Sequence, residues 1–193
     1  MKPLEDLFRD AQQMHGKLCP GQVIGVRMAV LGCASVGIND PQRDRRLRVW
    51  VEIDRCATDA VQVVTGCKLG RRTLKFYDYG KMAATFLNTE SGRAVRVVAR
   101  DDARSRVGAY APGVGDKAEA QLAAYKVMPD QELFATMPVA VDLTTYDEPG
   151  HPLKRVFCDA CGEGINDNRE VQHDGRLLCR PCARGGYYRP LSE

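Results

Sequence analysis

The apolar residues of the first forty positions predict two helices. Residues 3–14 carry one buried helical stripe at the i, i+3, i+4, i+7 spacing: Leu4, Leu7, Phe8, Ala11 and Met14. A second helix is predicted to begin at the segment CPG, residues 19–21, because proline is favoured at the first helical position. This places Cys19 at the N-cap. The residues that follow, up to Val36, are apolar on nearly every side, which is typical of a central buried helix.

The middle of the chain changes to the period of β-strands. Alternation over residues 47–53 predicts a half-buried strand. A helix over residues 57–64 follows it, with Cys56 at or beside the helix N-terminus. One more helix is predicted over residues 116–127, and further strands over residues 73–79, 82–87, 94–99 and 139–143. The fold class expected from this pattern is α+β, a mixed helix and antiparallel-sheet domain.

The segment TTYDEPGHP, residues 144–152, is polar and rich in glycine and proline, as linkers are. It divides the chain into an expected domain over residues 1–143 and a small C-terminal domain over residues 153–193. No apolar run reaches the roughly 18 residues of a membrane span. The first residues, MKPLEDLFRD, do not resemble a secretory signal, so a cytoplasmic location is expected.

Eight cysteines are present, and four of them form two CxxC pairs near the C-terminus: Cys158, Cys161, Cys179 and Cys182. Two such pairs separated by 17 residues have the spacing of a zinc site. Four thiolates complete the tetrahedral shell of Zn²⁺ and leave no position for water, so the ion is expected to be structural. A segment of about 40 residues is too small to build a stable core unaided, and metal binding supplies the missing folding free energy.

Between the CxxC pairs, residues 170–172 and 177–178 are expected to form a hairpin over the turn HDG, residues 173–175. The stretches FCDACGEGI and LLCRPCARG resemble a treble-clef or ribbon finger of the DksA/TraR type. Residues 151–193 contain seven Lys or Arg against six Asp or Glu. This balance argues against nucleic-acid binding and favours protein contacts or dimerisation.

A second group of candidate ligands lies in the N-terminal half, in HGKLCPG (residues 15–21) and EIDRCATDA (residues 52–60). Each segment places a cysteine at a predicted helix N-terminus, where the helix dipole favours the thiolate that binds metal or attacks an electrophile. His15, four residues before Cys19, lies within reach of the same centre. The alternative is that Cys19 and Cys56 are buried small residues without chemistry, as is expected of Cys33.

Three long stretches resemble the E-subunit family of formylmethanofuran dehydrogenase, FmdE: HGKLCPGQVIGVRMA, VEIDRCATDAVQVVTGCKLGRRTLKFYDYGKMAATF and YAPGVGDKAEAQLAAYKVMPDQELF. The resemblance covers most of residues 1–143. It implies an α+β domain that forms a homodimer, with a cleft that binds Zn²⁺ or another transition metal. By motif, the site residues it implies are His15, Cys19, Cys56 and Cys67, with Asp59 nearby. Lys17 stands where similar proteins often have a second histidine.

The resemblance also implies an association with molybdenum- or tungsten-dependent oxidoreductase subunits that interconvert formyl groups and CO₂. The protein would then be a metal-binding accessory subunit without a pterin site of its own. A second hypothesis is a stand-alone enzyme on a small carbonyl compound, with Cys19 or Cys56 as the catalytic nucleophile or with a metal-bound water. A third is a regulatory module that uses the finger to bind protein or nucleic acid.

Overall fold

The computed structural model describes residues 1–189 and residue 191. The chain divides into two compact units, Met1–Asp142 and Leu143–Glu193. The first unit is a mixed α/β domain, and the second is a small region of two hairpins with a four-cysteine cluster. The predicted fold class is therefore confirmed. No helix in the described part of the chain has the length and apolar character needed to cross a membrane.

The first unit is built on one five-stranded sheet in the order β2-β1-β3-β4-β5. Its strands are β1 Leu47–Val51, β2 Leu74–Phe76, β3 Ala83–Asn88, β4 Ala94–Ala99 and β5 Phe134–Val139. All neighbouring strands are antiparallel except β1 and β2, which run parallel and are joined through α3. The fold is therefore mainly the expected antiparallel one, with a single β-α-β unit at one edge.

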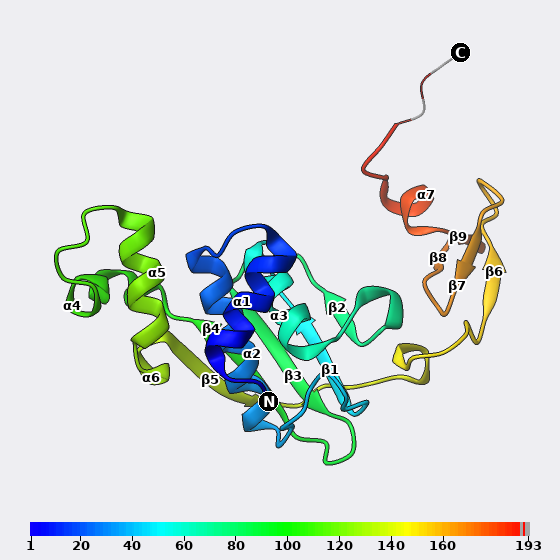
Figure 1. The fold of residues 1–193 in the computed structure, drawn as a ribbon. Coiled ribbons are helices and arrows are strands. Elements are labelled where there is room, and N and C mark those ends of the chain that lie inside the picture. The colour runs from blue at the N-terminus through cyan, green and yellow to red at the C-terminus, as the bar shows by residue number, and fades with distance from the viewer. Residues whose placement is uncertain (190, 192–193) are drawn as a thin grey trace. The chain divides into compact units, whose positions relative to one another are not determined.

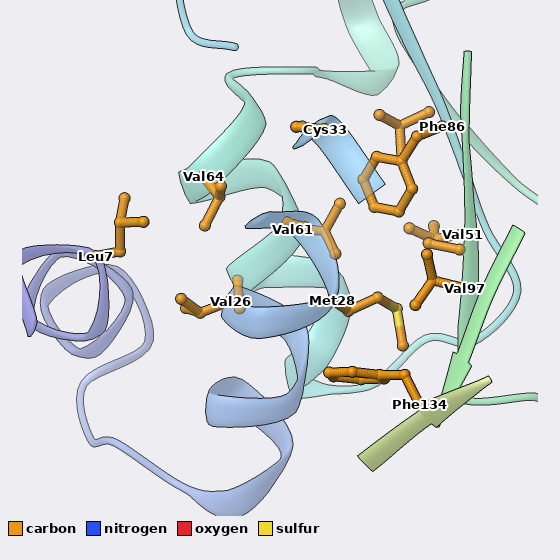
Figure 2. Close-up of a cluster of buried hydrophobic side chains, with 14 of the residues drawn as sticks. Leu7, Val26, Met28, Cys33, Val51, Val61, Val64, Phe86, Val97 and Phe134 are labelled. Atoms are coloured by element: carbon orange, nitrogen blue, oxygen red, sulfur yellow. The ribbon is translucent and has the colours of Figure 1, made fainter. Parts of the chain in front are cut away.

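Three helices pack on one face of this sheet (Figure 1): α1 Leu4–His15, α2 Pro20–Ser35 and α3 Cys56–Thr65. The core between them contains Val26 and Met28 of α2, Val61 of α3, and Phe86 and Val97 of the sheet (Figure 2). The remaining helices of the unit are short or peripheral: α4 Val107–Tyr110, α5 Lys117–Val127 and α6 Asp130–Leu133.

Helix α2 is central because its small residues allow close packing. A Cβ added at Gly25 would lie 2.5 Å from the carbonyl oxygen of Ala57 in α3. Arg27 of α2 is only 9% exposed, and its guanidinium donates to the Tyr125 and Met128 carbonyls at 2.7 and 2.5 Å. It also pairs with Asp130. Since the last carbonyls of a helix have no partner within the helix, Arg27 satisfies the C-terminal end of α5.

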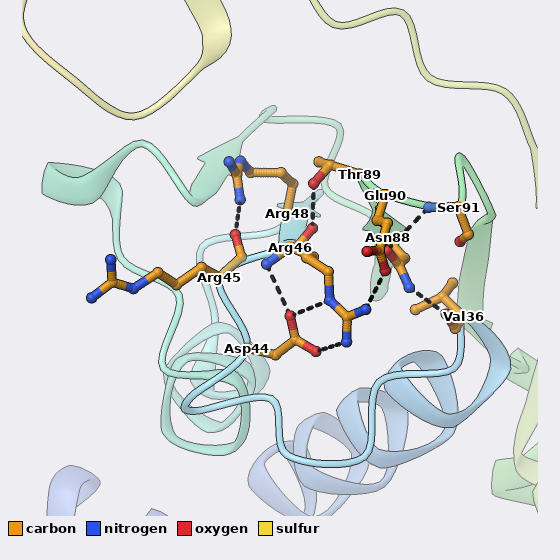
Figure 3. Close-up of polar contacts among 9 residues, drawn as sticks. All are labelled: Val36, Asp44, Arg45, Arg46, Arg48, Asn88, Thr89, Glu90 and Ser91. Carbon is orange, nitrogen blue, oxygen red and sulfur yellow. Dashed lines mark hydrogen bonds and ion pairs between the residues drawn. The ribbon is translucent and has the colours of Figure 1, made fainter.

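The loop from α2 to β1 is held by polar contacts (Figure 3). Arg46 binds both Asp44 and Glu90, and its hydrogen bonds lower the pKa of Asp44. Asn88, at the end of β3, donates its side-chain amide to the Val36 carbonyl at 3.1 Å. These contacts fix the start of β1 against β3, and β1 leads directly to Cys56.

One predicted strand is wrong. Residues 139–143 do not form the last strand of the sheet; β5 is Phe134–Val139 and pairs with β4 along its whole length. Pro138 made this segment a poor strand candidate, but β5 is an edge strand, where a residue without an N–H is tolerated. The predicted strand over residues 73–79 is also shorter, because β2 is only Leu74–Phe76.

The second unit contains two hairpins and a short helix. Strands β6 Arg155–Phe157 and β7 Gly164–Asn166 form the first hairpin, and β8 Val171–His173 and β9 Arg176–Leu178 form the second. Helix α7, Arg180–Arg184, follows with Cys179 as its N-cap. The predicted hairpin between the CxxC pairs is confirmed.

Candidate metal centres

Three residues from three helix ends meet in the first unit. His15 is the last residue of α1, Cys19 is the N-cap of α2, and Cys56 is the first residue of α3. Their ligand atoms all lie within 4.8 Å of one another, and all three residues are half-buried. The side chains that the two sequence motifs single out are therefore adjacent in space, with one imidazole and two thiols.

The backbone brings these helix ends together in two ways. Gly16 follows α1 with φ of +91°, a conformation that L side chains rarely adopt, and it turns the chain so that α2 starts beside the end of α1. The close approach at Gly25 packs α2 against Ala57 of α3, one residue after Cys56. The N-terminus of α3 also follows β1, which runs parallel to β2, and the carboxyl ends of parallel strands are where α/β folds place ligands.

Asp59 orients the histidine. Its Oδ2 lies 2.9 Å from Nδ1 of His15, and it sits in the first turn of α3, three residues after Cys56. A histidine that donates Nδ1–H to a carboxylate has Nε2 free as an acceptor, which is the arrangement found behind metal-binding histidines. Asp59 therefore belongs to the site as the partner of His15.

Electrostatics at Cys56 differ from the expectation. Burial first, and then the neighbouring Cys19 thiol, raise the pKa of Cys56. The prediction that the helix N-terminus lowers the pKa of this thiol is therefore wrong. Such a thiol gives up its proton when a cation replaces it, which favours a ligand role for Cys56 over that of an activated nucleophile.

The structure does not bring Cys67 to this cluster. Helix α3 separates it from Cys56 by about 15 Å at 1.5 Å per residue. Its thiol is 4% exposed, and its Sγ lies 3.9 Å from the Leu47 carbonyl oxygen. Burial raises the pKa of Cys67. The interpretation of Cys67 as a ligand of the N-terminal site is thus not supported by the geometry, and Cys67, like Cys33, is a core residue.

A cleft of about 450 Å³ opens beside the cluster. His15, Cys56 and Asp59 lie at its polar end, and its apolar wall consists of Val51, Ile53, Leu69, Leu74 and Phe76. No sequence motif pointed to this wall, because its residues come from β1, from the turn after α3 and from β2. The local signal that could have found it was a large apolar residue, Leu69, in a polar turn segment.

In the second unit the four cysteines of the CxxC pairs form one cluster, with their Sγ atoms within 4.8 Å of one another. The backbone N–H of Cys179 donates to Sγ of Cys158 at 3.2 Å, and that of Cys182 donates to Sγ of Cys179 at 3.4 Å. Hydrogen bonds from backbone N–H groups lower the pKa of Cys158 to about 6. Bonds of this kind favour thiolates, the form that zinc requires.

The two centres differ in what their donors can do. Four thiolates close the shell of a zinc ion at the finger, which fits a structural role. At the N-terminal cluster, His15, Cys19 and Cys56 supply three donors, and the cleft leads to the remaining position. Three protein ligands with one open position is the pattern of metal sites that bind a substrate or a water.

Comparisons with known proteins agree with this organisation. A curated relative from Archaeoglobus fulgidus, a probable S-adenosyl-L-methionine-binding protein, is 36% identical over 97 residues, which span 49% of this chain and only 26% of the relative. The crystal structure of an FmdE-like protein of tungsten formylmethanofuran dehydrogenase, from Syntrophus aciditrophicus, superimposes with a TM-score of 0.62 at 20% identity, and the match covers 96% of this chain and 94% of that one. This second likeness shows the fold.

Two family models match the chain in separate segments. Residues 152–188 match the prokaryotic DksA/TraR C4-type zinc finger, which implies a structural zinc at Cys158, Cys161, Cys179 and Cys182. Residues 14–135 match the model described as FmdE, molybdenum formylmethanofuran dehydrogenase operon. The chain therefore belongs to the FmdE family and carries a C4-type zinc finger after its FmdE domain.

Proposed function

We propose that this protein is a metal-binding accessory protein of one-carbon formyl and CO₂ metabolism. In this proposal, Zn²⁺ or a related transition ion is held by His15, Cys19 and Cys56. The observation that carries the proposal is the meeting of these three donors, within 4.8 Å of one another, at the polar end of a cleft. The description of the matching family refers to a molybdenum formylmethanofuran dehydrogenase operon, and this supports the metabolic context.

In this proposal, each residue near the cluster has a definite task. Cys19 and Cys56 supply two negative charges that neutralise a divalent ion, and His15 supplies a neutral nitrogen. Asp59 holds the imidazole ring in place through the 2.9 Å contact at Nδ1. The bound ion would supply a Lewis acid at the cleft, which polarises an oxygen or sulfur of a small molecule. The same site would serve an enzyme acting on a small carbonyl compound.

A second candidate is binding of S-adenosyl-L-methionine, which the name of the A. fulgidus relative suggests. The matched segment spans 26% of that protein, so its ligand site can lie outside the shared part. Equilibrium dialysis of the full-length protein with S-adenosyl-L-methionine decides this point. Binding that Leu69→Asp abolishes would place the ligand in the cleft, and absence of binding would remove the candidate.

The proposed partners follow from the family rather than from the geometry. They are a second copy of the chain and the molybdenum or tungsten oxidoreductase subunits. Light scattering of the purified protein measures the first, and co-purification with those subunits from the native organism measures the second. A monomer that co-purifies with none of them would contradict the accessory-subunit role.

Metal analysis of the full-length protein tests the N-terminal site itself. We expect two metal ions per chain in the wild type and one in the double variant Cys19→Ser/Cys56→Ser. The matched control is Cys67→Ala, which also removes a thiol near α3 but should retain two metals. One ion per chain in the wild type, unchanged in the double variant, would overturn the proposal.

A further inference from the structure

The composition of the cleft walls points to a ligand with an apolar body. Five of its lining residues are large and apolar, and two of these are left unusually accessible: Leu69 is 60% exposed and Phe76 is 42% exposed. Exposed apolar side chains gathered around one hollow mark a binding site more often than a bare surface. The volume of about 450 Å³ lies within the range of small-molecule sites.

The polar residues of the cleft lie next to the metal cluster and are already engaged. Asp59 is bonded to His15 at 2.9 Å, Thr58 donates its hydroxyl to the Ile53 carbonyl, and Arg55 lies 4.0 Å from Asp54. The described side chains thus offer an incoming molecule one strong recognition element at this end, which is the metal position. A fitting ligand has one donor atom for the metal and little other polarity.

We infer that the cleft binds a small hydrophobic thiol, whose sulfur takes the open metal position while its hydrocarbon part lies against Leu69, Leu74 and Phe76. This inference rests on the metal site proposed above. It adds the class of ligand and the wall that selects it.

The donor atoms at the cluster favour sulfur over oxygen. A metal ion held by two thiolates is soft, and soft ions prefer thiolate ligands. A thiol has a pKa of about 8.5, so it loses its proton to solvent on binding near neutral pH, whereas an alcohol holds its proton far more tightly. The step is a ligand exchange: the metal–sulfur bond forms, water leaves the metal, and one proton is released without oxidation or reduction.

The charge balance permits a third thiolate. Zn²⁺ with the thiolates of Cys19 and Cys56 and a neutral His15 carries no net charge. One further thiolate brings the centre to a single negative charge. At the finger, four cysteines already surround the ion, so the same thiol has no position to occupy there.

Calorimetric titration of the full-length zinc protein with straight-chain thiols of two, four and six carbons tests the inference. Each methylene that enters an apolar wall contributes about 0.8 kcal/mol, so affinity should rise about fourfold per carbon. Alcohols of the same lengths form the comparison series and should bind much more weakly. Equal affinities for thiols and alcohols would overturn the preference for sulfur.

Cobalt substitution gives a second readout that does not depend on any activity. Sulfur-to-cobalt charge-transfer absorption rises when a third thiolate joins two, and the finger contributes a constant background because its shell is closed. We expect this rise on adding a six-carbon thiol to the wild type and its absence in the double variant Cys19→Ser/Cys56→Ser. No change in the loaded wild type would overturn the inference.

The variant Leu69→Asn separates wall from metal. Because Leu69 is 60% exposed, the change should not disturb the core, and we expect two metals per chain with a weaker dependence on thiol length. Val127→Asn is the matched control, since Val127 is 65% exposed but lies on α5, outside the cleft lining. Loss of the N-terminal metal in the wild type would refute the proposed function. Retained metal with no dependence on thiol length would refute this inference alone.

Discussion

Oδ2 of Asp59 lies 2.9 Å from Nδ1 of His15 and so ties the first turn of α3 to the last residue of α1. If Asp59 orients His15 for a metal ion, Asp59→Asn should lower metal affinity at this site by about 10- to 100-fold. Competition with a coloured chelator measures the affinity, and the finger retains its zinc because its four cysteines lie in the other unit.

Asp54→Asn is the control for that experiment. Asp54 lines the same cleft, but its side chain is 72% exposed and its ion pair is with the neighbouring Arg55. Removal of this charge should leave metal affinity within a few-fold of the wild type. An equal loss in both variants would mean that Asp59 acts only through the general negative charge of the cleft.

Gly25→Ala should weaken both the fold and the N-terminal site. The new Cβ would lie 2.5 Å from the Ala57 carbonyl oxygen and 2.8 Å from the Ala60 Cβ, so α2 and α3 have to separate. We expect a loss of about 1–3 kcal/mol in the free energy of unfolding, as in other overpacked cores. Chemical denaturation measures this loss, and the metal affinity should fall with it because Cys19 and Cys56 are carried by these two helices.

Gly21→Ala is the matched control on the same helix. Its added Cβ would lie 3.4 Å from the Cys56 Cβ, which is ordinary van der Waals contact. Alanine is favoured over glycine within a helix by up to about 1 kcal/mol, so stability should be equal or higher. A larger loss at Gly21 than at Gly25 would contradict the account of the helix crossing.

Local sequence signals predicted one part of the site, and long-range packing decided the rest. Cys19 follows a helix-start signal, Cys56 stands where a strand gives way to a helix, and His15 lies four residues before Cys19, so these three could be found from short motifs. The role of Asp59 depends on how α1 meets α3, which no local pattern encodes. Cys67 shares a motif with Cys56 but lies beyond the far end of α3.

The strands show the same division. Residues 94–99 were predicted correctly as β4, because β-branched residues dominate that run. β5 was misplaced because Pro138 is acceptable only in an edge strand, and edge position is a property of the whole sheet. The apolar wall of the cleft, which includes Leu69 and Phe76, also exists only after β2 has paired with β1.

Arg27→Ala should destabilise the first unit by about 2–4 kcal/mol, because it leaves two helix-end carbonyls and Asp130 without their buried charged partner. Thermal and chemical denaturation measure the change. Arg9→Ala is the control: Arg9 is 64% exposed and pairs with Asp6 at the surface, so its loss should cost less than about 1 kcal/mol. Similar losses in both variants would contradict the capping role of Arg27.

Cys158→Ser should release the finger zinc and unfold the finger without unfolding the first unit. Its Sγ accepts the Cys179 backbone N–H at 3.2 Å, and the unit is too small to stay folded without the metal. Limited trypsin digestion should then cut after Arg176 and Arg184 while residues 1–142 stay intact. His173→Ala is the control, because His173 contacts Asp174 at 3.5 Å and lies outside the four-cysteine cluster, so zinc and protease resistance should persist.

Alkylation of the chelated, otherwise native protein should divide the cysteines of the first unit into two classes. Cys33 is 0% exposed and Cys67 is 4% exposed, and burial raises the pKa of both thiols, so little thiolate forms near neutral pH. Cys19 and Cys56 are half-buried beside the cleft and should react with iodoacetamide first. Mass spectrometry of the digested protein measures each rate, and denaturant should equalise them. Labelling of Cys67 as fast as Cys56 would contradict its place in the core.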